Sequence, residues 1–186
     1  MLNKHDIDLK KEFDVLQNQF GIDILYMRAN KYIRCKCYDT LHQCGDPKCP
    51  TCFGMGHVTS IEKRRTILYN GSSSSDANSI KPSETGLLHS TGNVLYTKEE
   101  VLSKERDFIF ITTWDSMGFP VQILKVFEIV NAQPVRDTKG KTAFCANYTK
   151  LRTDMTLTAN KYVNSLGSNA KLLLSKGKRY LWPITV

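Results

Sequence analysis

The 186-residue sequence lacks any apolar run close to the roughly 20 residues that a helix needs to span a bilayer. It also lacks an apolar stretch behind Met1, where polar and charged residues follow at once. We therefore expect no membrane segment and no secretory signal, and a chain kept in a reducing cytosol. A Gly-rich phosphate loop, a nucleophile motif and a convincing acid–base pair are missing as well. The sequence thus predicts no catalytic residues, no small-molecule substrate and no enzyme.

Acidic residues are fewer than basic ones, 18 against 26, which gives a formal net charge of +8. Four thiolates around one Zn²⁺ would lower this charge by about two units. Lys and Arg are spread along the chain, and their densest group is Lys63-Arg64-Arg65. A positive field of this size suits an acidic protein surface or a nucleic acid, or is simply a solvated basic surface.

The N-terminal part carries apolar residues at helical spacing, with Asp6 or Asp8 as the cap and Gly21 as the stop. This pattern predicts an amphipathic helix over residues 8–20. Residues 22–28 alternate well enough to predict a strand that leads into a group of cysteines. After that group, the chain again looks extended from His57 to Tyr69.

The second half is rich in β-branched and aromatic residues separated by turn signals. The predicted strands are residues 93–97, 107–113, 120–130 and 141–151. Cys145, inside the last of them, is interpreted as a buried small hydrophobe. Residues 70–92 contain much Gly and Ser and few apolar residues, so they predict a long loop, either a contact loop or a linker. The C-terminal tail is expected to contain one short helix at residues 168–175, and Trp182-Pro183 marks the end of this tail.

These elements predict an α+β, mainly β fold: a small antiparallel barrel or meander with an N-terminal helix and an inserted zinc-knuckle loop. The predicted organisation is an N-terminal helix, strand and zinc-binding module at 1–69, a flexible loop at 70–92, and a β-rich module with a helical tail at 93–186. One compact domain is the alternative.

Five of the six cysteines are packed into one short segment. Two residues between Cys49 and Cys52 let one turn present both sulfurs to a single ion, and Gly54 permits the tight backbone that this turn needs. Cys35 and Cys37 have a shorter bite, but they supply a second pair if the chain bends between the pairs. We therefore predict a structural Zn²⁺ bound by Cys35, Cys37, Cys49 and Cys52.

Other ligands and other chemistries remain open at this point. Cys44, His42 or His57 could replace one of the first pair, Cys35 or Cys37. Disulfides would suit a secreted chain, but no signal peptide is visible. An iron–sulfur centre is another alternative, because sulfur ligands for iron and zinc follow similar spacing rules. A redox dithiol at Cys49 and Cys52 would normally lie in a βαβ unit, which the sequence does not show. Four thiolates close the coordination shell, so the ion is expected to hold the loop and not to perform a reaction.

Three segments of the sequence resemble a zinc-binding segment found in virion structural proteins of tailed bacteriophages. They are Tyr26-Met27-Arg28, Ile33-Arg34-Cys35-Lys36-Cys37 and Asp46-Pro47-Lys48-Cys49-Pro50-Thr51-Cys52-Phe53-Gly54-Met55-Gly56-His57-Val58. The resemblance covers about residues 13–60 and is most specific from Cys49 to Gly56. It implies that the two cysteine pairs are the ligands, whereas Cys44 departs from the pattern.

The β-rich half is similar to phage neck proteins that close the head after packaging, in which a small barrel carries a long loop. The similar segments are Asp107-Phe108-Ile109-Phe110 and Val121-Gln122-Ile123-Leu124-Lys125-Val126. The resemblance implies a homo-oligomeric ring at the head–tail junction, made in the bacterial cytoplasm and carried in the virion. Its partners would be portal or connector proteins and tail or neighbouring neck subunits. A baseplate position is the alternative.

A nucleic-acid-binding zinc module is the rival hypothesis. Lys36, Lys48 and residues 63–65 would contact phosphates, and Tyr38 and Phe53 would stack on bases. This hypothesis does not explain the β-rich half of the chain. Contact with DNA is retained as an alternative expectation for the basic residues.

Overall fold

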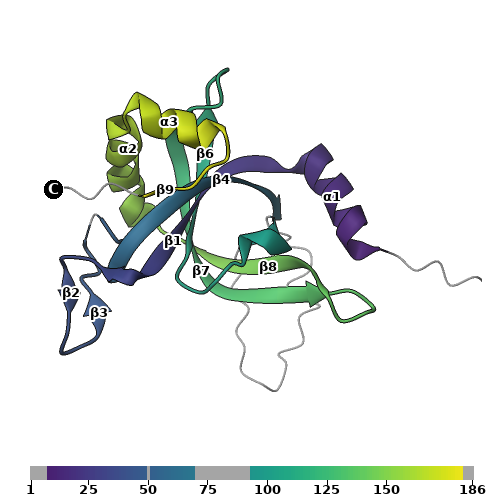
Figure 1. The fold of residues 1–186 in the computed structure, drawn as a ribbon, viewed down its shortest axis with the longest axis horizontal. Coiled ribbons are helices and arrows are strands. Elements are labelled where there is room, and N and C mark those ends of the chain that lie inside the picture. Colours follow the sequence, from purple (N-terminus) through teal and green to yellow (C-terminus); the bar gives the residue numbers. More distant parts are fainter. Residues whose placement is uncertain (1–7, 50, 70–92, 182–186) are drawn as a thin grey trace, which may run out of the picture.

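The structure is a computed structural model that describes residues 8–49, 51–69 and 93–181. A closed six-stranded antiparallel barrel forms its centre, which confirms the predicted fold class (Figure 1). The barrel strands are β1 (Ile22–Arg34), β4 (His57–Tyr69), β5 (Val94–Lys98), β6 (Phe108–Trp114), β7 (Pro120–Arg136) and β8 (Thr142–Leu151). Their order is β1-β6-β7-β8-β5-β4, and a second pairing between β4 and β1 closes the ring. Strands from both sides of residues 70–92 thus share one barrel.

Helix α1 (Leu9–Phe20) begins and ends as the sequence predicts. The Asp8 side chain accepts a hydrogen bond from the Lys11 amide, which is the usual N-cap geometry. The Gly21 amide donates to the carbonyl of Gln17 at 2.9 Å and closes the last turn. Phe13 is buried and stacks on Phe144 of β8, with ring centroids 4.5 Å apart, so the helix is attached to the barrel wall.

Strands β1 and β6 are buried on both faces. Ile24 and Tyr26 of β1 belong to a cluster inside the barrel, whereas Leu25 and Met27 belong to a second cluster outside it. Residues of β6 divide between the same two clusters. The outer cluster is covered by α2 (Thr156–Ser165) and α3 (Ser168–Ser175), of which only α3 was predicted.

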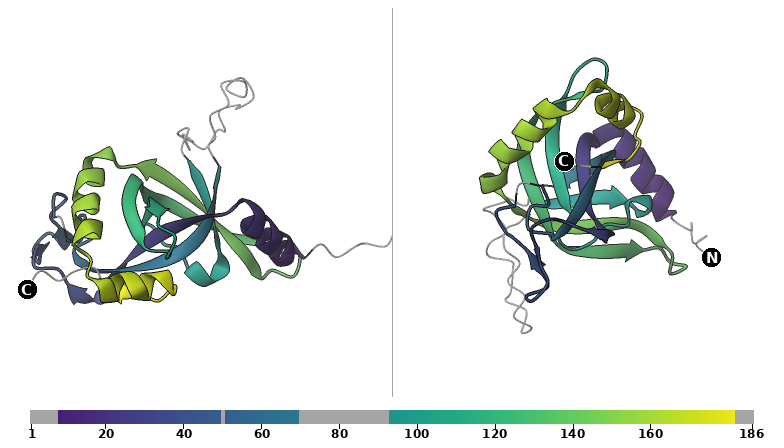
Figure 2. Two further views of the ribbon diagram at one scale, coloured as in Figure 1. Left: turned by 90° about the horizontal axis from the view of Figure 1, so that it is seen from above. Right: turned by 60° about the vertical axis from the view of Figure 1, so that its left-hand side comes forward.

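Residues 35–56, here called the cysteine loop, connect β1 to β4 and contain the short hairpin of β2 (Tyr38–Asp39) and β3 (Cys44–Gly45). The loop projects from one end of the barrel, and α1 lies at the other end (Figures 1 and 2). Two 3₁₀ turns, η1 (Glu99–Val101) and η2 (Thr153–Met155), and the two-residue strand β9 (Tyr180–Leu181) complete the described elements.

Two predictions fall on residues that the structure does not describe: the long loop at 70–92 and the chain end marked by Trp182-Pro183. Among the described helices, none combines the length and the apolar character that crossing a bilayer requires.

Candidate metal centre

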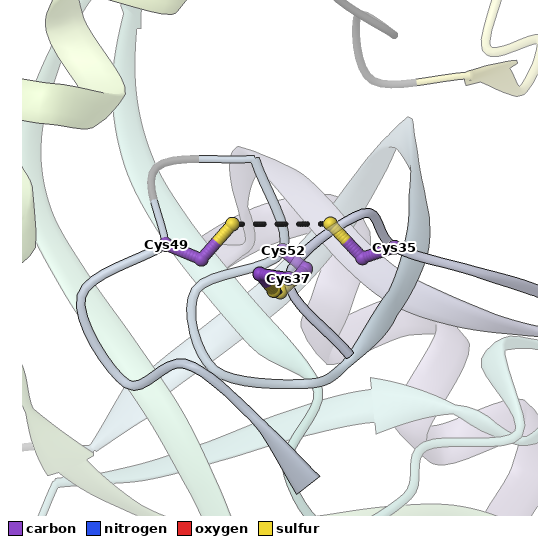
Figure 3. Close-up of side chains that lie close together, drawn as sticks. All are labelled: Cys35, Cys37, Cys49 and Cys52. Atoms are coloured by element: carbon purple, nitrogen blue, oxygen red, sulfur yellow. Dashed lines mark hydrogen bonds between the residues drawn. The ribbon is translucent and has the colours of Figure 1, made fainter. Parts of the chain in front are cut away.

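The four cysteines predicted as ligands converge in the cysteine loop (Figure 3). Their sulfur atoms all lie within 4.8 Å of one another. The Sγ atoms of Cys35 and Cys49 are 3.8 Å apart, and those of Cys37 and Cys52 are 3.3 Å apart. Each close contact therefore joins one cysteine of the first pair to one of the second, so the chain bends between the pairs as the prediction requires.

This spacing fits a tetrahedral metal ion. With metal–sulfur bonds of about 2.3 Å, the sulfurs at two corners of a tetrahedron lie about 3.8 Å apart. The separation of Cys35 and Cys49 has this value, and that of Cys37 and Cys52 is somewhat shorter. All four are free thiols, and Cys52 is fully buried. The donor set thus suits a thiophilic ion that is shielded from water.

The first cysteine pair is positioned by the end of β1. Cys35 directly follows the last residue of this strand, and its amide donates to the carbonyl of Gly56 at 3.0 Å. The Tyr38 amide then donates to the carbonyl of Cys35, also at 3.0 Å, which closes a turn around Cys37. The turn directs two sulfurs separated by one residue to the same side.

The second pair lies on a turn that begins with Asp46-Pro47. The Cys49 amide donates to the Asp46 carbonyl at 2.9 Å, and the Asp46 side chain accepts from the Lys48 amide at 2.9 Å. Asp and Pro are the residues that favour the first two positions of such a turn. The Phe53 amide donates to the carbonyl of Cys49 at 3.0 Å, which brings Cys52 onto the same side as Cys49.

Three glycines let the backbone pack closely around the sulfurs. Gly54 and Gly56 have φ angles of 83° and 73°, which side chains other than glycine rarely adopt. The Gly56 amide donates to the Sγ of Cys52 at 3.3 Å. A Cβ atom on Gly45 would lie 2.4 Å from the Gly56 nitrogen. From the sequence, Gly54 was assigned the tight backbone of this turn, whereas Gly45 and Gly56 were noted only as part of the segment and the close approach between them was not predicted.

The sulfurs influence each other's ionisation. Burial, and next the hydrogen bond with the Cys52 sulfur, raises the pKa of the Cys37 thiol. Burial also disfavours the Cys49 thiolate, but the backbone amides of Cys52 and Thr51 outweigh it and lower the pKa of this thiol. Four thiolates at this distance need a cation among them, so metal binding would release protons from the group.

The sequence matches no protein-family model and no curated protein.

The alternative ligands lie apart from the four sulfurs. Cys44 is exposed on β3. The His42 Nδ1 atom pairs with the carboxylate of Asp39 at 2.5 Å, and the His57 Nδ1 atom lies 3.1 Å from the Met55 carbonyl oxygen. Cys145 is buried in β8, at 8% exposure, as predicted for a small hydrophobe.

The residues named for a nucleic-acid module are largely engaged elsewhere. Lys63 pairs with Asp23 at 2.9 Å, Arg64 pairs with Glu62 at 3.1 Å, and Arg65 donates to backbone carbonyls at the end of α1. The ring of Phe53 is 4% exposed and lies against Phe108 and Phe110, so it does not present a face for base stacking. The dense basic group thus consolidates the fold.

Proposed function

We propose that this chain is a structural component of a tailed-phage virion, in a neck or head–tail connector position, and that one Zn²⁺ fixes its cysteine loop. The observation that carries the proposal is the set of four converging sulfurs in a loop without an apolar core of its own. Among the described residues, the cluster inside this loop consists of the four cysteines and Met55. The segment that resembles the zinc-binding segment of phage virion proteins is the one that forms this cluster.

Zinc is the ion proposed because of the ligands. Four thiolates in tetrahedral spacing are typical of structural zinc and leave no open position for substrate or water. Because such a site rarely exists in an unfolded chain, the free energy of binding becomes free energy of folding. The ion would therefore hold the cysteine loop in one shape. The proposed role contains no catalytic step.

The proposed partners are neighbouring subunits of a homo-oligomeric ring and the portal, connector or tail proteins next to it. The position of the cysteine loop at one end of the barrel supports a role in contacts, because a loop there is free to reach a neighbour (Figure 2). The formal net charge of +8 favours neighbours with acidic surfaces.

The metal is tested by measuring zinc in the purified protein by mass spectrometry. We expect about one equivalent, lost in Cys49→Ser and Cys52→Ser because each leaves an incomplete shell. Cys44→Ser is the matched control and should keep its zinc, since this thiol lies outside the four. Iron with visible absorbance would show a cluster in place of zinc. A folded wild-type protein without any metal would refute the metal proposal.

The virion role is tested separately, by quantitative mass spectrometry of purified phage particles. We expect the chain in intact particles in a small fixed copy number, because a ring has a defined number of subunits. Its absence from particles would rule out the role, whatever the zinc content of the purified protein.

A further inference from the structure

A large cleft lies where the cysteine loop meets the barrel. Its volume is about 780 Å³. Its walls come from β1 (Arg28, Ala29, Asn30 and Tyr32), from Met55, His57 and Ser60, from Leu102 and residues 104–107, and from Arg179. Clefts of this volume are within the range of known ligand sites. No role described above uses this cleft.

Basic side chains prevail along its walls. They are Arg28, Lys104, Arg106 and Arg179. The two acidic residues there are Glu105 and Asp107, and Asp107 is already engaged. Its carboxylate accepts hydrogen bonds from the Tyr26 hydroxyl at 2.6 Å and the Lys104 amide at 3.1 Å. We call this site the basic cleft.

Two of the four cations are available to a ligand. Arg28 and Arg179 both contact the carboxylate of Glu62, at 2.9 and 3.4 Å. Lys104 and Arg106 are exposed, and neither side chain has an acidic partner within 4.0 Å among the described residues. An anion in the cleft would thus meet two cations, Lys104 and Arg106, that do not already pair with a carboxylate among the described residues.

The backbone that carries these two cations is held in an uncommon conformation. Leu102 and Arg106 have φ angles of 50° and 67°, and neither is glycine. Such residues persist only where the surrounding structure fixes them, and they concentrate at functional sites. Here the Leu102 amide donates to the Glu99 carbonyl at 3.0 Å, and the Arg106 amide donates to the Ile129 carbonyl at 2.8 Å. The segment is therefore fixed beside the cleft.

The lining of the cleft also includes an exposed aromatic ring. Tyr32 is 96% exposed, and Leu102, another lining residue, is 63% exposed. A basic groove with an exposed aromatic ring is the composition of sites for single-stranded nucleic acids, in which bases stack on the ring and phosphates contact the cations. An acidic peptide would use the cations but would leave the exposed ring without a role.

We propose that the basic cleft binds single-stranded nucleic acid, with phosphates at Lys104 and Arg106 and a base stacked on Tyr32. This site shares no proposed contact residue with the rival module considered from the sequence. It stands independently of the virion role, because neither the particle position nor the copy number enters it. It does depend on a folded cysteine loop, since Met55 of this loop lines the cleft.

The test is fluorescence anisotropy with the full zinc-loaded chain and a fluorescein-labelled oligothymidylate of about ten nucleotides. We expect Tyr32→Ala to weaken binding about tenfold, the usual effect of losing one stacked base. The double variant Lys104→Gln/Arg106→Gln should weaken binding by at least as much. It should also reduce the slope of log affinity against log salt by about 1.4, since each phosphate contact on a single strand contributes about 0.7.

The matched control is Lys125→Gln/Lys161→Gln, which removes the same charge from exposed positions on β7 and α2. It should bind nearly as the wild type does. Equal weakening in both double variants would mean diffuse attraction to a basic protein and would overturn the proposal. So would the absence of wild-type binding at low salt, or displacement of the probe by polyglutamate as readily as by unlabelled oligonucleotide, which would indicate an acidic protein partner.

Discussion

At the scale of single residues, the approach of two backbone segments decides whether the sulfurs can converge. A Cβ atom at position 45 would lie 2.4 and 2.6 Å from the nitrogen and Cα of Gly56, and both are backbone atoms that cannot rotate away. The same Gly56 amide donates to Cys52. A side chain at position 45 would therefore push the amide away from the sulfur.

Gly45→Ala should destabilise the protein by about 1–3 kcal/mol, as overpacking generally does. It should also weaken zinc binding, measured by competition with a chromophoric chelator. Gly167→Ala is the control, because a Cβ atom there has no neighbour within 4 Å and φ is negative. Equal zinc affinity in Gly45→Ala and the wild type would contradict the role assigned to Gly45.

Glu62 is a second residue on which much depends. Its side chain is 3% exposed and contacts Arg28, Arg64 and Arg179. Burial alone would raise the pKa of this carboxyl, but the hydrogen bond from Arg64 and the charges of the three arginines lower it below its ordinary value. A carboxyl with a depressed folded pKa stabilises the protein above the unfolded pKa of about 4.3, and this contribution is lost as pH falls through the folded pKa.

Glu62→Gln should lose about 1–3 kcal/mol of stability at pH 7, because the partly buried Arg28 and Arg64 lose their counter-charge while solvent still reaches them. The difference between wild type and variant should shrink as the pH falls from the unfolded pKa of about 4.3 through the lower folded pKa of Glu62, because the wild-type carboxyl then becomes neutral as well. Urea unfolding of both proteins at pH 7 and at acidic pH measures this difference in stability. Zinc loss in acid should affect wild type and variant alike, so it cancels in the comparison. Glu105→Gln, at an exposed position, is the control. A difference independent of pH would show that charge is not the cause.

At the scale of elements, the helices and strands that could be predicted are those defined by their own residues, through caps, turn residues and apolar periodicity. Helix α1 has a cap, a stop and a periodic apolar face, and β4 was predicted with its present bounds. Helix α2 was missed because its sequence, TLTANKYVNS, is rich in residues of low helix propensity and has no side-chain cap. Tertiary contacts form it instead: Ala159 and Val163 are buried, and the Asn160 side chain bonds both the amide and the carbonyl of Ile123 at 2.8 Å.

Phe53 is a buried aromatic side chain that joins the cysteine loop to the barrel. Phe53 directly follows Cys52 and adopts φ of 52°, uncommon for a bulky residue. Its ring lies 5.8 Å from that of Phe108 and 6.2 Å from that of Phe110, within the cluster beneath α2 and α3. No sequence pattern indicated this contact, since the notable feature of the segment is its cysteines.

Phe53→Ala should cost about 3–5 kcal/mol, the usual effect of removing a buried phenyl ring. Zinc affinity should fall as well, because the loop loses the contact that orients Cys52 against the barrel. Thermal unfolding with and without chelator measures both effects. Phe20→Ala removes the same group from a position that is 67% exposed and should have little effect. If the zinc affinity of Phe53→Ala equalled that of Phe20→Ala, the loop would be oriented by the metal alone.

At the scale of the whole molecule, the sequence predicted a barrel or a meander without deciding between them. Closure depends on the second pairing of β4 with β1, between strands separated by the cysteine loop. No local pattern contains that pairing. The stretches Ile24-Leu25-Tyr26-Met27 and Phe108-Ile109-Phe110 are continuously apolar because both faces of β1 and β6 are covered. In the sequence, the sign of this arrangement is that polar residues do not alternate with apolar ones in these stretches.

The distribution of apolar clusters predicts how the molecule responds to metal removal. The barrel has an interior cluster of its own, including Tyr26, Leu95 and Phe127. Among the described residues, the cluster within the cysteine loop consists of four cysteines and Met55, while Phe53 packs against the barrel instead. Chelation should therefore open the loop and leave the barrel folded. Hydrogen exchange measured by mass spectrometry should become about tenfold faster or more in residues 35–56, since losing the ion removes several kcal/mol of local stability.

Strands β5 and β8 should keep their protection in the same experiment, because they pair with each other, and β5 pairs with β4 at residues 66–69, the end of that strand remote from the loop. Returning one equivalent of zinc should restore protection in residues 35–56. Cooperative loss of protection throughout the chain would mean that the ion supports the whole fold through Phe53. Unchanged exchange in the loop would mean that the four sulfurs hold their positions without a metal, and the structural role of zinc would have to be abandoned.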